Sequence, residues 1–102
     1  MLSTTEPRHW PTKEHRDLFE TIASLRTRDE AERFLRDLCT RAELDAMAHR
    51  WQMARLLNEG LPYLEVAKRT HASTTTVTRV AQWLHRGEGG YALALRRRRR
   101  RS

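Results

Sequence analysis

The sequence contains a single cysteine, Cys39, so no disulfide can form within the chain. None of its five histidines forms an HxxxH pair or another metal-binding pattern, and we expect no metal or other cofactor. GxSxG, P-loop and paired-carboxylate motifs are also absent, so no pattern predicts an enzyme. No window approaches the roughly 18 to 20 apolar residues of a membrane-spanning helix, and the first residues lack the apolar stretch of a signal peptide. We therefore expect a soluble, cytoplasmic protein.

Glycine and proline do not occur between Pro11 and Gly60, and this long gap favours helices over any other structure. Residues 1–11 are predicted to form an extended arm. Apolar residues then recur at helical spacing and predict a first helix at about 12–26 and a second at about 29–38. The expected fold class is therefore all-α.

A third helix is predicted to begin at Thr40, because T-R-A-E forms a capping box in which Thr40 and Glu43 each bond the other's backbone N–H. This helix should end at Asn58-Glu59-Gly60, where glycine allows the chain to leave the helix. Its apolar residues lie on two faces, so we expect it to be central to the fold and covered on both sides. A short helix is predicted to follow at 63–70, after Pro62.

Large apolar side chains are scarce for a chain of this length. Apolar residues make up 38% of the 102 residues, and only three tryptophans, two tyrosines and two phenylalanines are present. This supply is thin for one compact core. We therefore expect the chain to share its core with a second copy of itself.

The net charge of +7 is concentrated at the C-terminal end, where residues 87–102 carry six arginines and one acidic residue. Residues 96–102 are predicted to form a disordered basic tail that follows a helical domain at 12–95. Such a run binds phosphate-rich partners without reading their sequence, or it is simply a solvated tail, and both interpretations stay open.

The stretch STTTVTRVAQWLHR, residues 73–86, is predicted to be a helix despite its threonines. Val77, Val80, Ala81 and Leu84 form one apolar stripe at 100° per residue, and Ser73 occupies the expected N-cap. With the short helix before it, this segment predicts a helix-turn-helix at about 63–86, whose second helix enters the major groove of double-stranded DNA. The expected DNA-binding residues are Lys68, Arg69, Ser73, Thr74, Thr75, Thr78, Arg79, Gln82 and Arg86.

The segments LCTRAELDAMAHRWQMARLLNEG (residues 38–60) and STTTVTRVAQWLHRGEGGYALAL (residues 73–95) resemble the Trp repressor family, most closely its YerC/YecD-type subgroup. The capping box, the Leu-Leu-x-x-Gly helix end and the Thr-x-Thr-Arg start of the second helix carry this resemblance. It implies an intertwined all-helical homodimer that regulates transcription, with two helix-turn-helix units reaching successive major grooves.

The resemblance also implies a candidate effector pocket, because Arg50 and Arg79 match the two arginines that hold tryptophan in the Trp repressor. Two departures oppose tryptophan as the effector: Val80 replaces a glycine and Trp83 replaces a small serine, so the Trp83 indole could fill the ligand space. We expect L-tryptophan not to bind, and we favour an ion pair for Arg50 and a phosphate contact for Arg79. The possible pocket residues are Thr40, Arg50, Thr76, Arg79, Val80 and Trp83.

A second function also fits the sequence. The chain could be a helical interaction module that does not read DNA and whose arginine tail binds RNA or an acidic partner. The two functions differ in where binding resides: in the threonine-rich helix for the DNA regulator, and in the tail for the interaction module.

Overall fold

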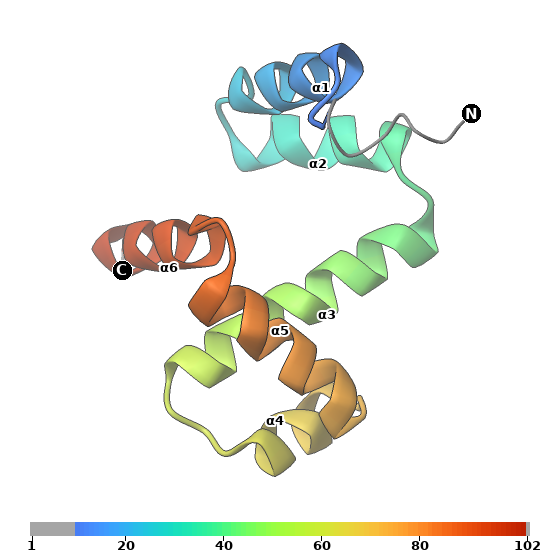
Figure 1. The fold of residues 1–102 in the computed structure, drawn as a ribbon. Helices are drawn as coiled ribbons and strands as arrows, with labels where there is room; N and C mark the ends of the chain where they lie inside the picture. Colours follow the sequence, from blue (N-terminus) through green and yellow to red (C-terminus); the bar gives the residue numbers. More distant parts are fainter. Residues whose placement is uncertain (1–9, 102) are drawn as a thin grey trace, which may run out of the picture. The chain divides into compact units, whose positions relative to one another are not determined.

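The computed structural model describes residues 10–101, with side chains through Arg99. Within this range the chain forms six helices and no strand, as the sequence predicted (Figure 1). Most of the expected arm at residues 1–11 lies outside the described residues. The chain divides into two compact units, unit 1 up to Thr40 and unit 2 from Arg41 onwards. The helices are α1 (Lys13–Ala23), α2 (Arg28–Leu38), α3 (Arg41–Asn58), α4 (Tyr63–Thr70), α5 (Thr74–Arg86) and α6 (Gly90–Arg101).

Helix α1 begins at an N-cap that uses a histidine where a capping box usually has glutamate or glutamine. The Thr12 hydroxyl accepts from the His15 N–H at 3.2 Å, and His15 Nδ1 accepts from the Thr12 N–H at 3.0 Å. The helix ends at Ala23, three residues earlier than predicted. Ser24 closes it, since its hydroxyl donates to the Thr21 carbonyl at 2.6 Å.

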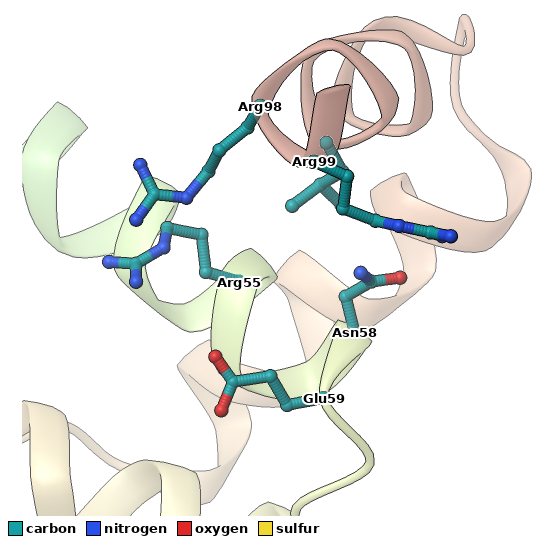
Figure 2. A pocket seen from close by; sticks show the side chains of 6 residues that line it. Arg55, Asn58, Glu59, Arg98 and Arg99 are labelled. Carbon is teal, nitrogen blue, oxygen red and sulfur yellow. The ribbon is translucent and has the colours of Figure 1, made fainter. Parts of the chain in front are cut away.

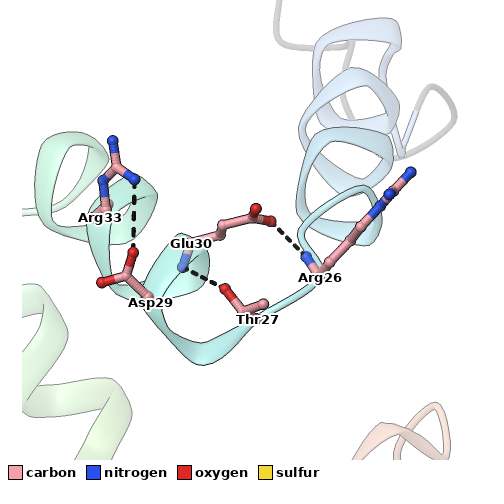
Figure 3. A network of polar contacts seen from close by, with 5 residues as sticks. All are labelled: Arg26, Thr27, Asp29, Glu30 and Arg33. Carbon is pink, nitrogen blue, oxygen red and sulfur yellow. Dashed lines mark hydrogen bonds and ion pairs between the residues drawn. The ribbon is translucent and has the colours of Figure 1, made fainter.

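Helix α2 begins in a network of side-chain bonds to the backbone (Figure 3). The Thr27 hydroxyl accepts from the Glu30 N–H at 3.1 Å, and Glu30 Oε1 accepts from the Arg26 N–H at 2.8 Å. An exposed ion pair between Asp29 and Arg33 follows at 3.6 Å. The two cap bonds satisfy backbone donors that have no partner within the helix, which explains why α2 starts at this point.

Unit 1 has no buried core of its own. No residue of α1 or α2 is buried, and Phe19 and Leu38 are each 51% exposed. Unit 1 therefore leaves large apolar side chains open to water, a feature typical of interaction surfaces.

Unit 2 contains a compact apolar core at the C-terminal half of α3. Met53, Ala54 and Leu56 are buried there, and they pack with residues of α4 and α5. The helix ends at Asn58 as predicted, and Gly60 adopts a positive φ of 92° just after it. The predicted capping box of Thr40 and Glu43 stays a prediction, although both residues stand where it requires them, directly before α3 and in its first turn.

Helices α4 and α5 pack against each other and against α3 (Figure 1). Val66 of α4 and Val77 of α5 are fully buried, and the small residue Ala67 lies in the same core. Val77 belongs to the apolar stripe that the sequence predicted for the second helix of a helix-turn-helix. Burial of each valine contributes about 1.5–3 kcal/mol, so the angle between α4 and α5 is fixed by packing.

The turn between α4 and α5 places His71 in the left-handed conformation, with φ 55° and ψ 43°. The Ala72 N–H donates to the Ala67 carbonyl at 2.9 Å, and the His71 N–H donates to the Lys68 carbonyl at 3.4 Å. This is a Schellman motif, in which glycine is the usual residue at the left-handed position. His71 therefore occupies a strained position in the turn.

Helix α6 corrects the sequence prediction for the C-terminal end. The arginines from Arg96 onwards were expected in a disordered tail, but they continue α6 as far as Arg101. The start of the helix is held by packing: Leu95 is buried, and the Tyr91 ring stacks on Trp51 with ring centroids 6.3 Å apart. Arginine is a good helix former, so an anchored helix can extend through the run.

We predict that His71→Gly raises the free energy of unfolding by about 0.5–1 kcal/mol. Glycine avoids the cost of a side chain at positive φ, which exceeds the extra backbone entropy that glycine adds to the unfolded state. Urea denaturation at fixed protein concentration measures the change. As a matched control, His49→Gly at an exposed position within α3 should lower stability by about 0.5–1 kcal/mol. A loss of stability in His71→Gly would show that the turn does not require this conformation.

Candidate nucleic-acid interface

Helix α5 has one face in the core and the other in water. Val77, Val80 and Ala81 are buried against the rest of unit 2. Their burial fixes the rotation of the helix about its own axis, so the opposite face is presented to solvent. The exposed residues of α5 include the predicted DNA-binding residues Thr74, Thr75, Thr78, Arg79, Gln82 and Arg86.

Ser73 has a structural role at the start of α5. Its hydroxyl accepts from the Thr76 N–H at 3.1 Å and lies 3.1 Å from the Thr76 hydroxyl. The predicted N-cap is therefore confirmed. Because the cap already uses the Ser73 oxygen, this residue has less hydrogen-bonding capacity left for DNA than the threonines that follow it.

The Thr78 hydroxyl, in the second turn of α5, uses only part of its hydrogen-bonding capacity within the helix. The Thr78 hydroxyl donates to the Thr74 carbonyl at 2.8 Å, so its proton is used within the helix. Its oxygen lone pairs and its methyl group remain available at the exposed surface. These two features suit contacts with a base amino group and with a thymine methyl, respectively.

The positive charges of this surface have few acidic neighbours. Helix α5 contains no acidic residue, and Lys68 on α4 has no ion-pair partner among the described side chains. Arg69 pairs with Glu65 at 2.9 Å, a contact that sequence reasoning missed. Both side chains of this pair are partly exposed, and a surface pair of this kind contributes about 0–1 kcal/mol, so a phosphate can compete for the arginine.

The predicted effector-pocket residues are divided between the core and the surface. Val80 is only 3% exposed and belongs to the core cluster, whereas Trp83 is 63% exposed. Arg50, Thr76 and Arg79 are exposed in unit 2, and Thr40 belongs to unit 1. Within unit 2, therefore, the Trp83 indole lies largely in solvent and does not fill an enclosed space.

The backbone at the end of α5 leaves little room for a side chain at Gly87. A Cβ atom built on Gly87 would lie 2.5 Å from the Trp83 carbonyl oxygen and 3.1 Å from Cε3 of its ring. Any other residue at position 87 would have to move the end of the helix or the indole. Glycine thus allows the backbone to pass close to Trp83.

A second basic site, which sequence reasoning did not identify, lies between the end of α3 and α6 (Figure 2). The arginine run signalled positive charge, but only its continuation as a helix brings Arg98 and Arg99 to Arg55 on α3. The lining residues of this cleft are Arg55, Asn58, Glu59, Leu95, Arg98 and Arg99.

Neither a membrane-spanning helix nor a metal site is found in the part of the chain that the structure describes. None of its helices combines the length and the apolar character needed to cross a bilayer. Among the same residues, no three of the histidine, cysteine, aspartate and glutamate side chains gather as metal ligands would.

The packed pair α4 and α5, with its exposed polar face and basic surround, defines a helix-turn-helix DNA-binding protein. Residues 13–99 match the family model for the Trp repressor protein. The chain belongs to the Trp repressor family, whose members are DNA-binding regulators of transcription.

Individual relatives agree with this assignment. The chain is 42% identical over 85 residues to the uncharacterized protein YerC of Bacillus subtilis (strain 168), a match that covers 83% of this chain and 82% of YerC. A TrpR-like protein from Eubacterium eligens ATCC 27750 superposes with a TM-score of 0.81 at 36% identity, over 89% of this chain and 94% of that one. A putative Trp repressor from Staphylococcus aureus gives a TM-score of 0.76 at 33% identity, over 82% and 84%.

Proposed function

We propose that this protein is a homodimer that recognises specific sequences of double-stranded DNA through α5. One observation carries the proposal: the buried stripe of α5 turns its threonine-rich face outward, directly after a packed helix and a tight turn. In a helix-turn-helix, the N-terminal residues of the second helix are the ones that reach base edges. Thr74, Thr75 and Thr78 occupy this part of α5.

Phosphate contacts would position this helix in the groove. Lys68 and Arg69 stand in the last turn of α4, and Arg79 and Arg86 stand on α5 beyond the threonines. Contacts of this kind supply affinity and orientation, whereas the hydroxyls supply discrimination between sequences. Loss of a phosphate contact should therefore weaken binding to all sequences about equally, whereas loss of a hydroxyl should reduce the preference among sequences.

The homodimer is supported by apolar surface that one chain leaves uncovered. Phe19 and Ile22 stand three residues apart on α1 and are 51% and 42% exposed, and Met47 in the first half of α3 is 39% exposed. Residues three apart share one face of a helix, so Phe19 and Ile22 form a continuous apolar patch. A second copy of the chain would bury these side chains and supply the core that unit 1 lacks.

L-tryptophan is not the effector in this proposal. Val80 occupies the position of a glycine in the Trp repressor, and its side chain is already packed in the core. Trp83 adds a bulky indole on the neighbouring exposed surface. Admitting a ligand indole beside Val80 would require this side chain to shift in a well-packed helix pair, which costs free energy.

The alternative function, an interaction module bound through its arginine tail, is weakened by the structure of α6. The arginine run extends a helix that packs on α3 and α5, so it is not a free tail. Deletion of residues 96–102 separates the two functions. The DNA regulator should keep its sequence preference with weaker affinity, whereas the interaction module should lose all nucleic-acid binding.

We expect selection from random duplex DNA to yield a palindromic consensus for the wild-type protein and none for Thr75→Ala/Thr78→Ala. The variant should still bind DNA, because its phosphate contacts remain. Thr21→Ala is a matched control: like Thr78, Thr21 bonds a carbonyl four residues earlier, but it lies on α1. An unchanged consensus in the double variant would contradict the role of α5.

The wild-type protein should have twice the 12.1 kDa mass of one chain in analytical ultracentrifugation. Phe19→Glu/Ile22→Glu should shift it toward the single-chain mass, since two carboxylates would have to be buried in the interface. Lys13→Glu makes the same change in net charge at an exposed position on a different face of α1 and should leave the mass unchanged. A wild-type protein with the single-chain mass would refute the homodimer.

Calorimetry with L-tryptophan at millimolar concentration should show no binding heat. The Val80 side chain stands where the Trp repressor has a glycine and is already packed in the core, so a ligand indole would have to displace it. A family member that binds tryptophan serves as the positive control in the same buffer. A dissociation constant in the micromolar range would contradict this prediction.

A further inference from the structure

The cleft between the last turn of α3 and α6 has a volume of about 180 Å³ and lies wholly within unit 2 (Figure 2). Arg55, Asn58 and Glu59 line it from the α3 side, and Arg98 and Arg99 line it from α6. A space of this size holds several water molecules and is large enough for a phosphate group.

Positive charge dominates the lining of the cleft. Three of its side chains are arginines and one is a glutamate. Figure 2 shows the guanidinium groups of Arg55 and Arg98 pointing to the same side, while Arg99 extends past the Asn58 amide. Among the described side chains, no ion pair is formed by Arg55 or Arg99.

Packing of the fold alone does not explain this arrangement. Successive arginines on α6 place like charges three and four residues apart, and such pairs destabilise a helix. The C-terminal end of α3 carries partial negative charge and attracts cations. That partial charge is small and the lining holds a single carboxylate, Glu59, so the cleft keeps a net positive charge that suits an anion.

We propose that this cleft binds a phosphate group of the DNA backbone, outside the groove that α5 enters. Guanidinium groups bind phosphate through two parallel N–H bonds, and the Asn58 amide offers a further donor. The assignment to DNA rests on the proposed function, because α6 packs on α5 and so moves with it on the duplex.

The cleft lies near one end of α5, and the residues that would read bases lie at the other end. Helix α6 follows the C-terminal end of α5, whereas the threonines stand at its N-terminal end (Figure 1). The thirteen residues of α5 span about 20 Å. The cleft therefore adds a sequence-independent contact beyond the recognised bases.

The Glu59 carboxylate repels a phosphate group. Removing its charge should therefore strengthen DNA binding, whereas removing an arginine of the cleft should weaken it. The substitution Glu59→Gln raises the net charge of the lining by one. The variant should bind DNA about threefold more tightly at low salt, since one repulsive contact is lost. If the arginines served only to pair with Glu59, Glu59→Gln would bind no more tightly and would unfold more easily, which would overturn the proposal.

The central experiment measures binding of the full chain to a labelled random-sequence duplex by fluorescence anisotropy, from about 50 to 200 mM salt. Arg98→Gln/Arg99→Gln should weaken binding about tenfold and reduce the slope of log K against log salt by about 1, the value for one lost phosphate contact. Arg96→Gln/Arg97→Gln is the matched control. It removes the same charge from the same helix at residues outside the cleft, and it should cost about threefold or less.

A variant on the other side of the cleft tests whether the site spans both helices. Arg55→Gln should weaken binding about as much per charge as the α6 variants. Arg41→Gln, at an exposed position of α3 outside the cleft, should have little effect. Equal losses for the cleft variants and their controls would mean that only diffuse charge matters, and they would overturn the proposal.

Two further outcomes distinguish this proposal from the proposed function. If no consensus sequence is selected but binding to random duplex still depends on the cleft arginines, the proposed function fails and the phosphate site stands. Inorganic pyrophosphate, titrated by calorimetry, tests the other source of the ligand. If Arg98→Gln/Arg99→Gln abolishes pyrophosphate binding but leaves DNA binding equal to that of its control, the assignment to DNA is overturned.

Discussion

The structure of unit 2 depends on the packing of Val66 and Ala67 on α4 against Val77 and Val80 on α5. Each buried valine contributes about 1.5–3 kcal/mol, more than an exposed ion pair such as Arg69 with Glu65. Packing therefore sets both the angle between the two helices and the rotation of α5. The exposed threonine face, and with it the proposed reading of DNA, follows from the position of these four side chains.

The small number of apolar residues also explains why unit 1 forms no buried core within a single chain. Its two helices are well capped, by Thr12 with His15 and by Thr27 with Glu30, yet neither has a buried residue. Caps decide where a helix begins, but each contributes only about 1 kcal/mol and cannot replace a core. The local structure of unit 1 is thus set by its own sequence, and its stability would come from the partner in the proposed dimer.

Helix α6 connects the core to the charged end of the chain. Tyr91 stacks on Trp51 and Leu95 is buried, so the arginines that follow are held at a defined place next to α3. A basic segment held in this way can form a site, whereas a free tail offers only diffuse charge. Because the fold holds the arginine run in place, the run can form a defined binding site, which its composition alone does not indicate.

The sequence by itself determined the helices up to Arg86, the Ser73 cap, the valine contacts and the family, because these features rest on periodicity and on bonds between near neighbours. It overextended α1 at its end, where Ser24 bonds back to the preceding turn. Only the tertiary structure decided that the arginine run is helical, that Trp83 is exposed while Val80 is buried, and that Arg55 and Arg98 line one cleft. The physical reason is that these outcomes depend on contacts between residues far apart in the chain, and no local pattern encodes the packing of α6 on α3.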